Sequence, residues 1–210
     1  MWIDLLLQAS IILIFLSMFL FIHNIPQTLL SKLRLLVMSR RSDVRAKRHF
    51  VLGAQLLSQS RSTPDNRTFA ARAVAEAELA ISLDPNDAAS HILKALALEL
   101  QGFRTSALDS LDAALSPMAV KSLSSAERGE ALYKRAELRV AVGGGGGAVE
   151  DLVESVRLGG DNAKAYGLLG ECYEKNGLRL EAQKAYEDAL RVQPNYKLAQ
   201  DALARLESRE

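Results

Sequence analysis

The first strong pattern in the chain is a long apolar run with no polar face. Residues 5–22 contain no charged side chain, and only Gln8, Ser10 and Ser17 are polar. At about 1.5 Å per residue, a helix of this length reaches roughly 27 Å, close to the hydrocarbon thickness of a bilayer. A buried core helix usually keeps one polar side, and this run is apolar all round. The pattern therefore predicts an amino-terminal transmembrane anchor over residues 1–25.

A cleavable signal peptide is the alternative interpretation of this run. Such peptides have positive charge before about 7–15 apolar residues and a small-residue cleavage site after them. Here Asp4 precedes a longer run, and the following sequence, FIHNIPQ, offers no such site. A retained anchor therefore fits better than a cleaved one.

Residues 26–45 change the pattern to basic residues among leucines at helical spacing. Lys and Arg are clustered here and absent before the apolar run. The positive-inside bias then predicts a single-pass membrane protein with its carboxy-terminal side in the cytosol. The segment reads either as an interfacial helix near anionic headgroups or as a solvated helix that joins the anchor to a domain. The pattern fits an anchor in the endoplasmic reticulum and one in the outer membrane of mitochondria or plastids equally well.

Apolar residues recur with a helical period of 3.6 from residue 46 onwards, in pairs of short helical segments. The clearest pair is AKAYGLLGECYEKNGLRLEAQKAYEDALRVQPN, which starts at Ala163. Counted from that residue, positions 4, 7, 8, 11, 20, 24, 27 and 32 are Tyr166, Leu169, Gly170, Tyr173, Ala182, Tyr186, Ala189 and Pro194. This spacing resembles the tetratricopeptide repeat (TPR), a helix–turn–helix unit of 34 residues.

Physical chemistry agrees with that resemblance. Two helices approach closely only where small residues meet, which is the expected role of Gly170 and Ala182. Gly177 suits the turn because a positive φ costs glycine little, and Pro194 stops the second helix.

Weaker copies of the repeat precede this one. Four alanines expected at the contact between paired helices are spaced by 34, 41 and 34 residues: Ala73, Ala107, Ala148 and Ala182. The extra residues of the middle interval fall in PMAVKSLSSAERG, an expected loop, and SRSTPDNRT makes the turn of the first repeat long. The expected repeats cover about residues 46–85, 88–117, 130–160 and 163–195, and residues 196–210 form a polar capping helix. The predicted fold is all-α: a helical solenoid of TPR-like repeats with a carboxy-terminal cap, after one transmembrane helix.

Five consecutive glycines, Gly143 to Gly147, fall at the turn of the third repeat. A phosphate-binding loop would need a strand before the glycines and a Gly-Lys-[Ser/Thr] sequence at their end, and neither is present. The run therefore reads as a loose turn. The register of the preceding helix stays open: either Tyr133, Ala136 and Val140 or Leu132 and Ala136 face the partner helix.

Charge and composition exclude several classes of function. Residues 1–45 hold five basic and two acidic side chains, whereas the other 21 basic and 23 acidic residues leave a net charge of −2. Nucleic-acid binding therefore has no general electrostatic support. The single cysteine, Cys172, and three scattered histidines form no metal-ligand spacing, and no catalytic cluster is evident. We expect no enzyme, no metal, no cofactor and no small-molecule substrate.

Stacked repeats form a concave groove lined by their first helices, and the family pattern places particular positions in it. The candidate groove residues are Ile92, Leu93, Leu96, Leu100, Lys134, Arg135, Leu138, Lys164 and Leu168. An apolar floor with one basic shoulder suits an amphipathic helix or an acidic-ended peptide. The alternative is that the neighbouring helix covers the apolar part.

Some TPR proteins hold the acidic carboxyl terminus of a chaperone in a clamp of Lys, Asn and Arg side chains. In this chain the corresponding positions of the first two repeats carry Phe50, Ala54, Ile92 and Leu96. Only Lys164 matches a clamp lysine, and Leu168 replaces the arginine. The resemblance therefore does not extend to chaperone-tail capture.

The sequence thus predicts a membrane-anchored scaffold, adaptor or receptor that binds a peptide or helix of a protein partner on the cytosolic side. The main alternative is a constitutive structural subunit of a membrane complex. An organelle import receptor or a chaperone-docking protein is a weaker alternative, based on the layout of anchor, basic flank and repeats.

Overall fold

The structure, a computed structural model, describes residues 2, 8–10, 12–15, 18–19, 25–62, 66–143, 146–159 and 161–208. The chain divides into two compact units, Met1–Arg45 and Ala46–Glu210. Within the described ranges all regular secondary structure is helical, which confirms the all-α prediction.

The predicted localisation, a single-pass membrane protein with its repeats facing the cytosol, is wrong. Among the described residues, no helix is both long enough and apolar enough to cross a bilayer. A span needs about 20 apolar residues in one continuous helix. The long helix α2 (Ile25–Ser62, 38 residues) has charged residues along its sequence, Lys32, Arg34, Arg40 and Arg41 among them. Much of the predicted anchor lies outside the described residues.

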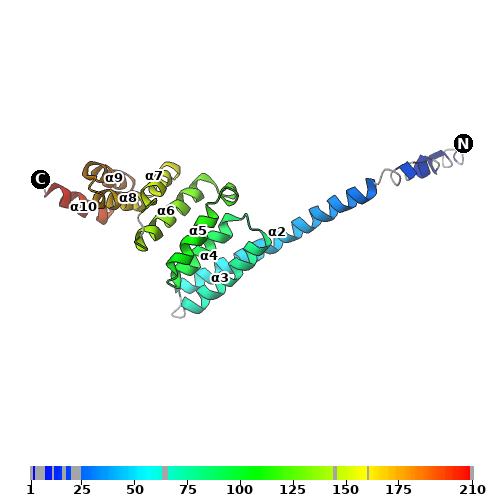
Figure 1. The fold of residues 1–210 in the computed structure, drawn as a ribbon, viewed down its shortest axis with the longest axis horizontal. Helices are drawn as coiled ribbons and strands as arrows, with labels where there is room; N and C mark the ends of the chain where they lie inside the picture. Colours follow the sequence, from blue (N-terminus) through cyan, green and yellow to red (C-terminus); the bar gives the residue numbers. More distant parts are fainter. Residues whose placement is uncertain are drawn as a thin grey trace. The chain divides into compact units, whose positions relative to one another are not determined.

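The second unit is a succession of helices in which each helix packs against the next (Figure 1). After α2 come α3 (Asn66–Leu83), α4 (Ala88–Leu100), α5 (Arg104–Ala114), α6 (Ser125–Ala141), α7 (Ala148–Leu158), α8 (Ala163–Lys175), α9 (Arg179–Val192) and α10 (Lys197–Glu207). A short 3-10 helix, η1 (Ala119–Ser122), lies between α5 and α6. Contacts between successive helices are the arrangement of a helical solenoid.

The helix ends follow from local chemistry. Asp87 and Asn162 accept hydrogen bonds from backbone N–H groups at the starts of α4 and α8. Ser124 and Glu127 form a capping box at the start of α6, which satisfies two of the backbone groups left open there. Gly102 and Gly177 take positive φ values of 87° and 75° in the turns after α4 and α8, as expected for Gly177.

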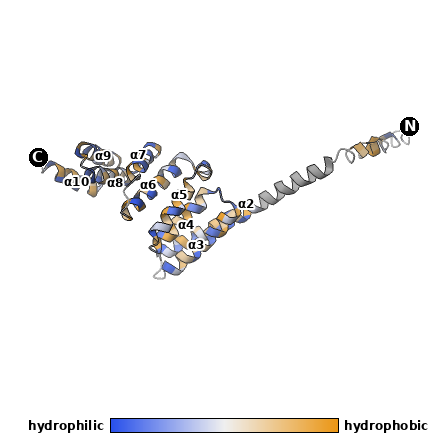
Figure 2. Cartoon of the chain, in the orientation of Figure 1, coloured by the Kyte–Doolittle hydropathy of each residue, from blue (hydrophilic) through white to orange (hydrophobic). Residues whose placement is uncertain are grey.

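The core of the solenoid is built largely from alanine. The four alanines predicted at the contacts between paired helices, Ala73, Ala107, Ala148 and Ala182, are all fully buried. Their small side chains let the paired helices approach, while larger residues fill the space around them. Hydrophobic and hydrophilic residues alternate along the helices of this unit (Figure 2).

Two connections differ from the sequence prediction. The long turn expected in the first repeat is largely helical, because α2 continues to Ser62 and α3 begins at Asn66. Likewise, the loop expected before the third repeat is partly ordered: η1 occupies its centre, and its end already belongs to α6. The Ser122 hydroxyl accepts a hydrogen bond from the Ala88 N–H at 3.0 Å, which ties η1 to the start of α4.

Candidate peptide-binding groove

The unit Ala46–Glu210 contains an open cavity of about 640 Å³ between the first helices of three successive repeats. Its walls come from α2, α4 and α6. Most of its lining is apolar: Phe50, Ala54 and Leu57 from α2, Ala89, Ile92, Leu93 and Leu96 from α4, Leu123 before α6 and Ala131 within it. We call this cavity the apolar groove.

The floor of the apolar groove is only partly covered by the fold. Leu93 is buried, at 4 % exposure, in a cluster with Leu57 of α2 and Ala73 of α3. Ile92 and Leu96 are half-buried: they pack against core clusters on one side and line the groove on the other. These α4 side chains therefore support the core and also present apolar surface to the groove.

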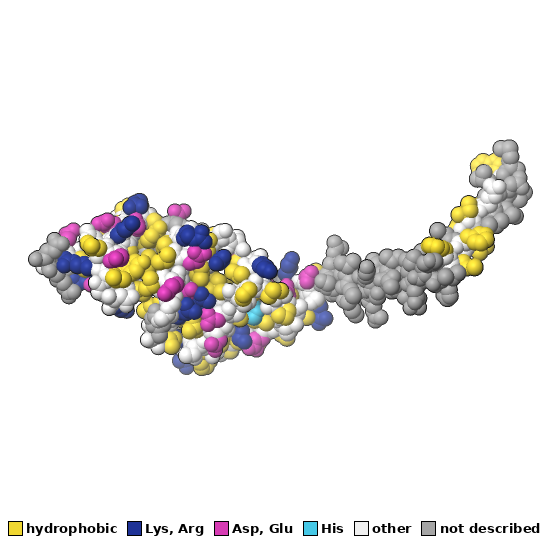
Figure 3. All heavy atoms as spheres, turned by 45° about the horizontal axis from the view of Figure 1, so that its top comes forward, with side chains coloured by type: hydrophobic (Ala, Val, Ile, Leu, Met, Phe, Trp, Pro, Cys, Tyr) yellow, Lys and Arg dark blue, Asp and Glu magenta, His cyan; other side chains and the backbone are white. Residues whose placement is uncertain are grey.

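The rim of the apolar groove is charged. Ser58 and Arg61 stand on the α2 side, and Glu127, Glu130 and Lys134 stand on the α6 side. Figure 3 shows one face of the molecule, on which hydrophobic side chains lie between basic and acidic ones. An apolar floor with a polar rim is the usual anatomy of a site that binds an amphipathic partner.

Lys134, one of the predicted basic residues, reaches the groove but is paired. Its ammonium lies 2.7 Å from Glu137 Oε2 and 5.6 Å from the centre of the Tyr133 ring. Burial, with the charge of Glu137 added, raises the pKa of Tyr133 well above the ordinary phenol value, so this ring stays neutral. The positive charge of Lys134 is thus largely cancelled one turn along α6.

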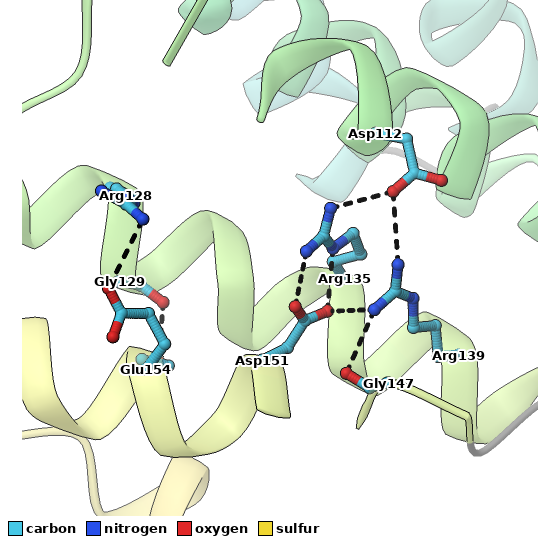
Figure 4. Close-up of polar contacts among 9 residues, drawn as sticks. Asp112, Arg128, Gly129, Arg135, Arg139, Gly147, Asp151 and Glu154 are labelled. Carbon is cyan, nitrogen blue, oxygen red and sulfur yellow. Dashed lines mark hydrogen bonds and ion pairs between the residues drawn. The ribbon is translucent and has the colours of Figure 1, made fainter. Parts of the chain in front are cut away.

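Arg135 points away from the groove into a network of charges between α5, α6 and α7 (Figure 4). Its Nε donates to Asp151 at 2.8 Å, and its Nη1 lies 3.0 Å from Asp112. Arg139 binds the same two carboxylates and donates to the Gly147 carbonyl at 3.1 Å. The hydrogen bond to Asp151 raises the pKa of Arg135, and Asp151 itself is 5 % exposed. Arg135 therefore links α5 of the second repeat to α6 and α7 of the third.

The other predicted groove residues lie outside the apolar groove. Leu138 is buried against Leu98 and Leu111, and Leu100 packs against the cluster between α2 and α4. Leu168 packs against the cluster around Tyr133. Lys164 is exposed and lines a second cavity of about 530 Å³ that also contains Lys134. Ile92, Leu93, Leu96 and Lys134 are thus brought together, and the remaining five are not.

Most of the predicted packing residues of the last repeat gather around the ring of Tyr186. Tyr186 is fully buried, in a cluster with Ala182, Ala189, Tyr166 and Tyr173. Leu169 and Gly170 are also buried, and Pro194 is exposed just beyond the end of α9. The Tyr186 hydroxyl donates to Glu174, which also binds Arg205 of α10 at 2.7 Å. The cap is therefore tied to the last repeat by a shared carboxylate.

The third repeat adopts one of the two registers left open by the sequence. Tyr133, Ala136 and Val140 share a core cluster with Ala148 and Leu152 of α7. The end of the glycine run forms part of the turn before α7: Gly147 has a φ of 77° and occupies the N-cap position. Its carbonyl accepts the Asp151 N–H at 3.2 Å, so this turn is fixed at its α7 end.

The sequence prediction missed the acidic wall of the groove. Glu127, Glu130, Lys134 and Glu137 are spaced by three, four and three residues, which places them on one side of α6. That spacing was visible in the sequence, but the assignment of groove positions from the family pattern passed over the three acidic residues. Leu57 on α2 was also not assigned to the groove, and Phe50 and Ala54 were considered only as positions of the chaperone clamp.

Among the described residues, no group of three or more His, Cys, Asp or Glu side chains is placed to hold a metal ion. Burial raises the pKa of Cys172, which packs in the core beside Leu169, so its thiol is a poor nucleophile. His49 is hydrogen-bonded to Glu76 at 2.7 Å and joins α2 to α3.

No protein-family profile and no curated protein sequence matches this chain. Solved structures do match it in fold. A crystal structure of MamA is 18% identical over 78% of this chain and 81% of its own, with a TM-score of 0.65. MamA from Desulfovibrio magneticus RS-1 is 18% identical over 79% and 85%, with a TM-score of 0.63. YrrB, described as a TPR protein with an unusual peptide-binding site, is 17% identical over 74% and 82%, with a TM-score of 0.57.

These neighbours are TPR proteins, so the fold of this chain is a TPR-like solenoid, as the spacing of its residues predicts. At this level of identity the likeness concerns the fold alone.

Proposed function

We propose that this chain is a protein-interaction module, a scaffold or adaptor that binds a peptide or helix of a protein partner in the apolar groove. The observation that carries the proposal is the open cavity of about 640 Å³ whose floor is apolar and whose rim is charged. Its volume lies within the range of roughly 300–1,000 Å³ usual for ligand sites. The peptide-binding site of YrrB, a protein of the same fold, adds support.

The geometry of α4 fits side chains presented by a helix or a short peptide. Ala89, Ile92, Leu93 and Leu96 follow one another at spacings of three, one and three residues, so they form a stripe along one side of α4. An amphipathic helix presents apolar anchors at the same spacing and can interdigitate with such a stripe. Burial of each large anchor contributes about 1.5–3 kcal/mol before the costs of association.

Capture of an acidic carboxyl terminus fits the groove less well. A carboxylate needs cationic or amide donors, and Phe50, Ala54, Ile92 and Leu96 provide none. All four line the apolar groove. A carboxylate placed there would lose its hydration without gaining partners.

A constitutive structural subunit is the second candidate, because half-buried Ile92 and Leu96 would also suit a permanent partner. The two functions differ in how readily the bound partner exchanges with free partner. An adaptor releases its partner on dilution, whereas a subunit keeps it at a fixed ratio through purification.

Site-specific photocrosslinking tests the proposal in the cell that makes the protein. A benzophenone amino acid placed at Ala89 samples the groove, and the same residue at exposed Ala75 on α3 is the matched control. We expect discrete protein adducts from position 89 that are absent from position 75. Equal labelling at both positions, or none at position 89, would contradict a groove-bound partner.

A further inference from the structure

The charges around the apolar groove are not evenly distributed. The α6 wall carries Glu127 and Glu130, and its only cation at the groove, Lys134, is bound to Glu137. On the opposite wall, α2 contributes Arg61. An occupant therefore meets negative charge on the α6 side and positive charge on the α2 side.

Resting on the proposed function, we propose that the partner segment is an amphipathic helix with lysine or arginine along the flank that faces α6. The sequence-based expectation of an acidic-ended peptide depended on a basic shoulder of Lys134 and Arg135. In the structure Lys134 is paired with Glu137, and Arg135 is bound to Asp112 and Asp151. Electrostatic complementarity thus selects a basic flank.

The two acidic side chains of the α6 wall have spare hydrogen-bonding capacity. Glu130 is exposed and accepts one hydrogen bond from Asn162 Nδ2, at 3.1 Å. Glu127 accepts from the Ser124 hydroxyl and N–H, both through Oε2. These hydrogen bonds lower the pKa of Glu127, so its carboxylate stays ionised at neutral pH. An ionised carboxylate offers about four acceptor positions, enough for a lysine or arginine in addition.

A second cavity continues the acidic wall beyond the apolar groove. It shares Glu130 and Lys134 with the groove and adds Glu137, Asp161 and Lys164. The two cavities together are lined by four carboxylates, Glu127, Glu130, Glu137 and Asp161, and three cations, Arg61, Lys134 and Lys164. Arg61 is on the α2 side, so the surface from α6 to α8 is net negative. Phosphate backbones and acidic tails are disfavoured there.

A defined peptide series tests this charge selection on the full chain. Three fluorescent peptides of roughly 15 residues share one apolar helical face, and their flanks carry only Lys, only Gln or only Glu. Fluorescence anisotropy should show the Lys peptide binding about tenfold more tightly than the Glu peptide at low salt, with the Gln peptide between them. Added salt should narrow this difference, because it screens exposed charges.

Charge reversal on the protein provides the matched control. Glu130→Lys should remove the preference for the Lys peptide, whereas Glu181→Lys, an exposed site on α9, should leave it unchanged. Binding of the Gln peptide reports the apolar groove itself and separates the two proposals. Equal binding of all three peptides, or tighter binding of the Glu peptide, would contradict the proposed basic flank of the partner. It would leave the proposal of a peptide-binding groove intact.

Two further outcomes overturn more than the flank. If no peptide binds, both the basic flank and the proposed function fail. If the full chain is a stable dimer that excludes all three peptides, the occupant of the groove is a second copy of this chain, and the basic helical partner is wrong.

Discussion

The ring of Tyr186 lies so close to Gly170 that a Cβ atom on Gly170 would stand 2.5 Å from Tyr186 Cε1. This contact joins α8 to α9, and Tyr186 is fully buried, so the ring cannot move aside without disturbing the cluster around it. The signature glycine of the last repeat therefore makes room for the tyrosine on the partner helix.

The first prediction concerns this contact. Gly170→Ala should lower the free energy of unfolding by about 1–3 kcal/mol, because the added methyl group overpacks a rigid site. Urea unfolding followed by circular dichroism measures the change. Gly146→Ala is the matched control: a Cβ there meets nothing within 4 Å, so its unfolding midpoint should barely move. Similar effects of both changes would contradict the packing argument.

A second prediction follows from the charge network at Asp151. Asp151→Asn should destabilise the fold by about 2–3 kcal/mol, because Arg135 and Arg139 would both lose a charged acceptor at a buried site. Glu154→Gln removes ion pairs to Arg157 and Arg128, whose side chains are 66 % and 44 % exposed, and should change the midpoint far less. Thermal unfolding of the two variants side by side makes the comparison.

Alkaline pH should lower the stability of the fold through the buried Tyr186. Burial, with nearby Glu174 as a second cause, raises the pKa of Tyr186 above the ordinary value of 10.0. Above pH 10 the unfolded chain therefore loses this proton before the folded chain does. The contribution of Tyr186 to stability is full below pH 10 and is lost as the pH rises further.

Replacement of that hydroxyl gives the third prediction. In Tyr186→Phe, the free energy of unfolding should fall less steeply between pH 10 and pH 11 than in the unmodified chain. Urea unfolding at several pH values supplies the slope. An identical slope in both proteins would mean that Tyr186 does not contribute to alkaline unfolding.

Added bulk inside the groove provides the fourth test. Ala89→Trp places a large side chain in the cavity without removing a core residue, so it should weaken binding of the Lys-flanked peptide by at least about tenfold. The melting temperature should change little. Ala75→Trp, at an exposed site on α3, should leave affinity unchanged. Unimpaired binding by Ala89→Trp would place the peptide elsewhere.

The glycine turn supports a fifth prediction. Gly147 has a φ of 77°, and a Cβ there would lie 2.7 Å from Arg139 Nη1. Gly147→Ala should therefore cost about 1–2 kcal/mol, from backbone strain together with a disturbed arginine. In contrast, Gly143→Ala adds backbone strain alone, since the new Cβ atom would meet nothing within 4 Å. Chemical unfolding should rank Gly147→Ala as the more damaging of the two.

Much of the fold could be predicted from the sequence because helix packing has a local signature. The spacing of Ala73, Ala107, Ala148 and Ala182 identified the helix contacts, and all four alanines are buried. Helical period and turn glycines act within one repeat, so a single sequence shows them directly.

The groove was harder to predict, because its side chains form contacts with other helices that are distant in the sequence. Arg135 and Lys134 are neighbours in the sequence, yet Arg135 turns to Asp112 and Asp151 while Lys134 faces the groove. One residue along a helix is a rotation of about 100°, and position in a family pattern does not reveal a carboxylate on the next helix. Likewise, an apolar run by itself did not establish a membrane span.

Asp112 has a consequence for how the solenoid behaves as a whole. It belongs to α5 and reaches Arg135 and Arg139 of α6, across the connection that contains η1. In a solenoid each repeat is stabilised by contacts with its neighbours, so these ion pairs contribute to the coupling between the repeats on either side of this joint. The apolar groove spans the same joint, with α2 and α4 on one side and α6 on the other. A helix bound in the groove would contact both sides of this connection, so its binding should strengthen the coupling between the repeats on either side.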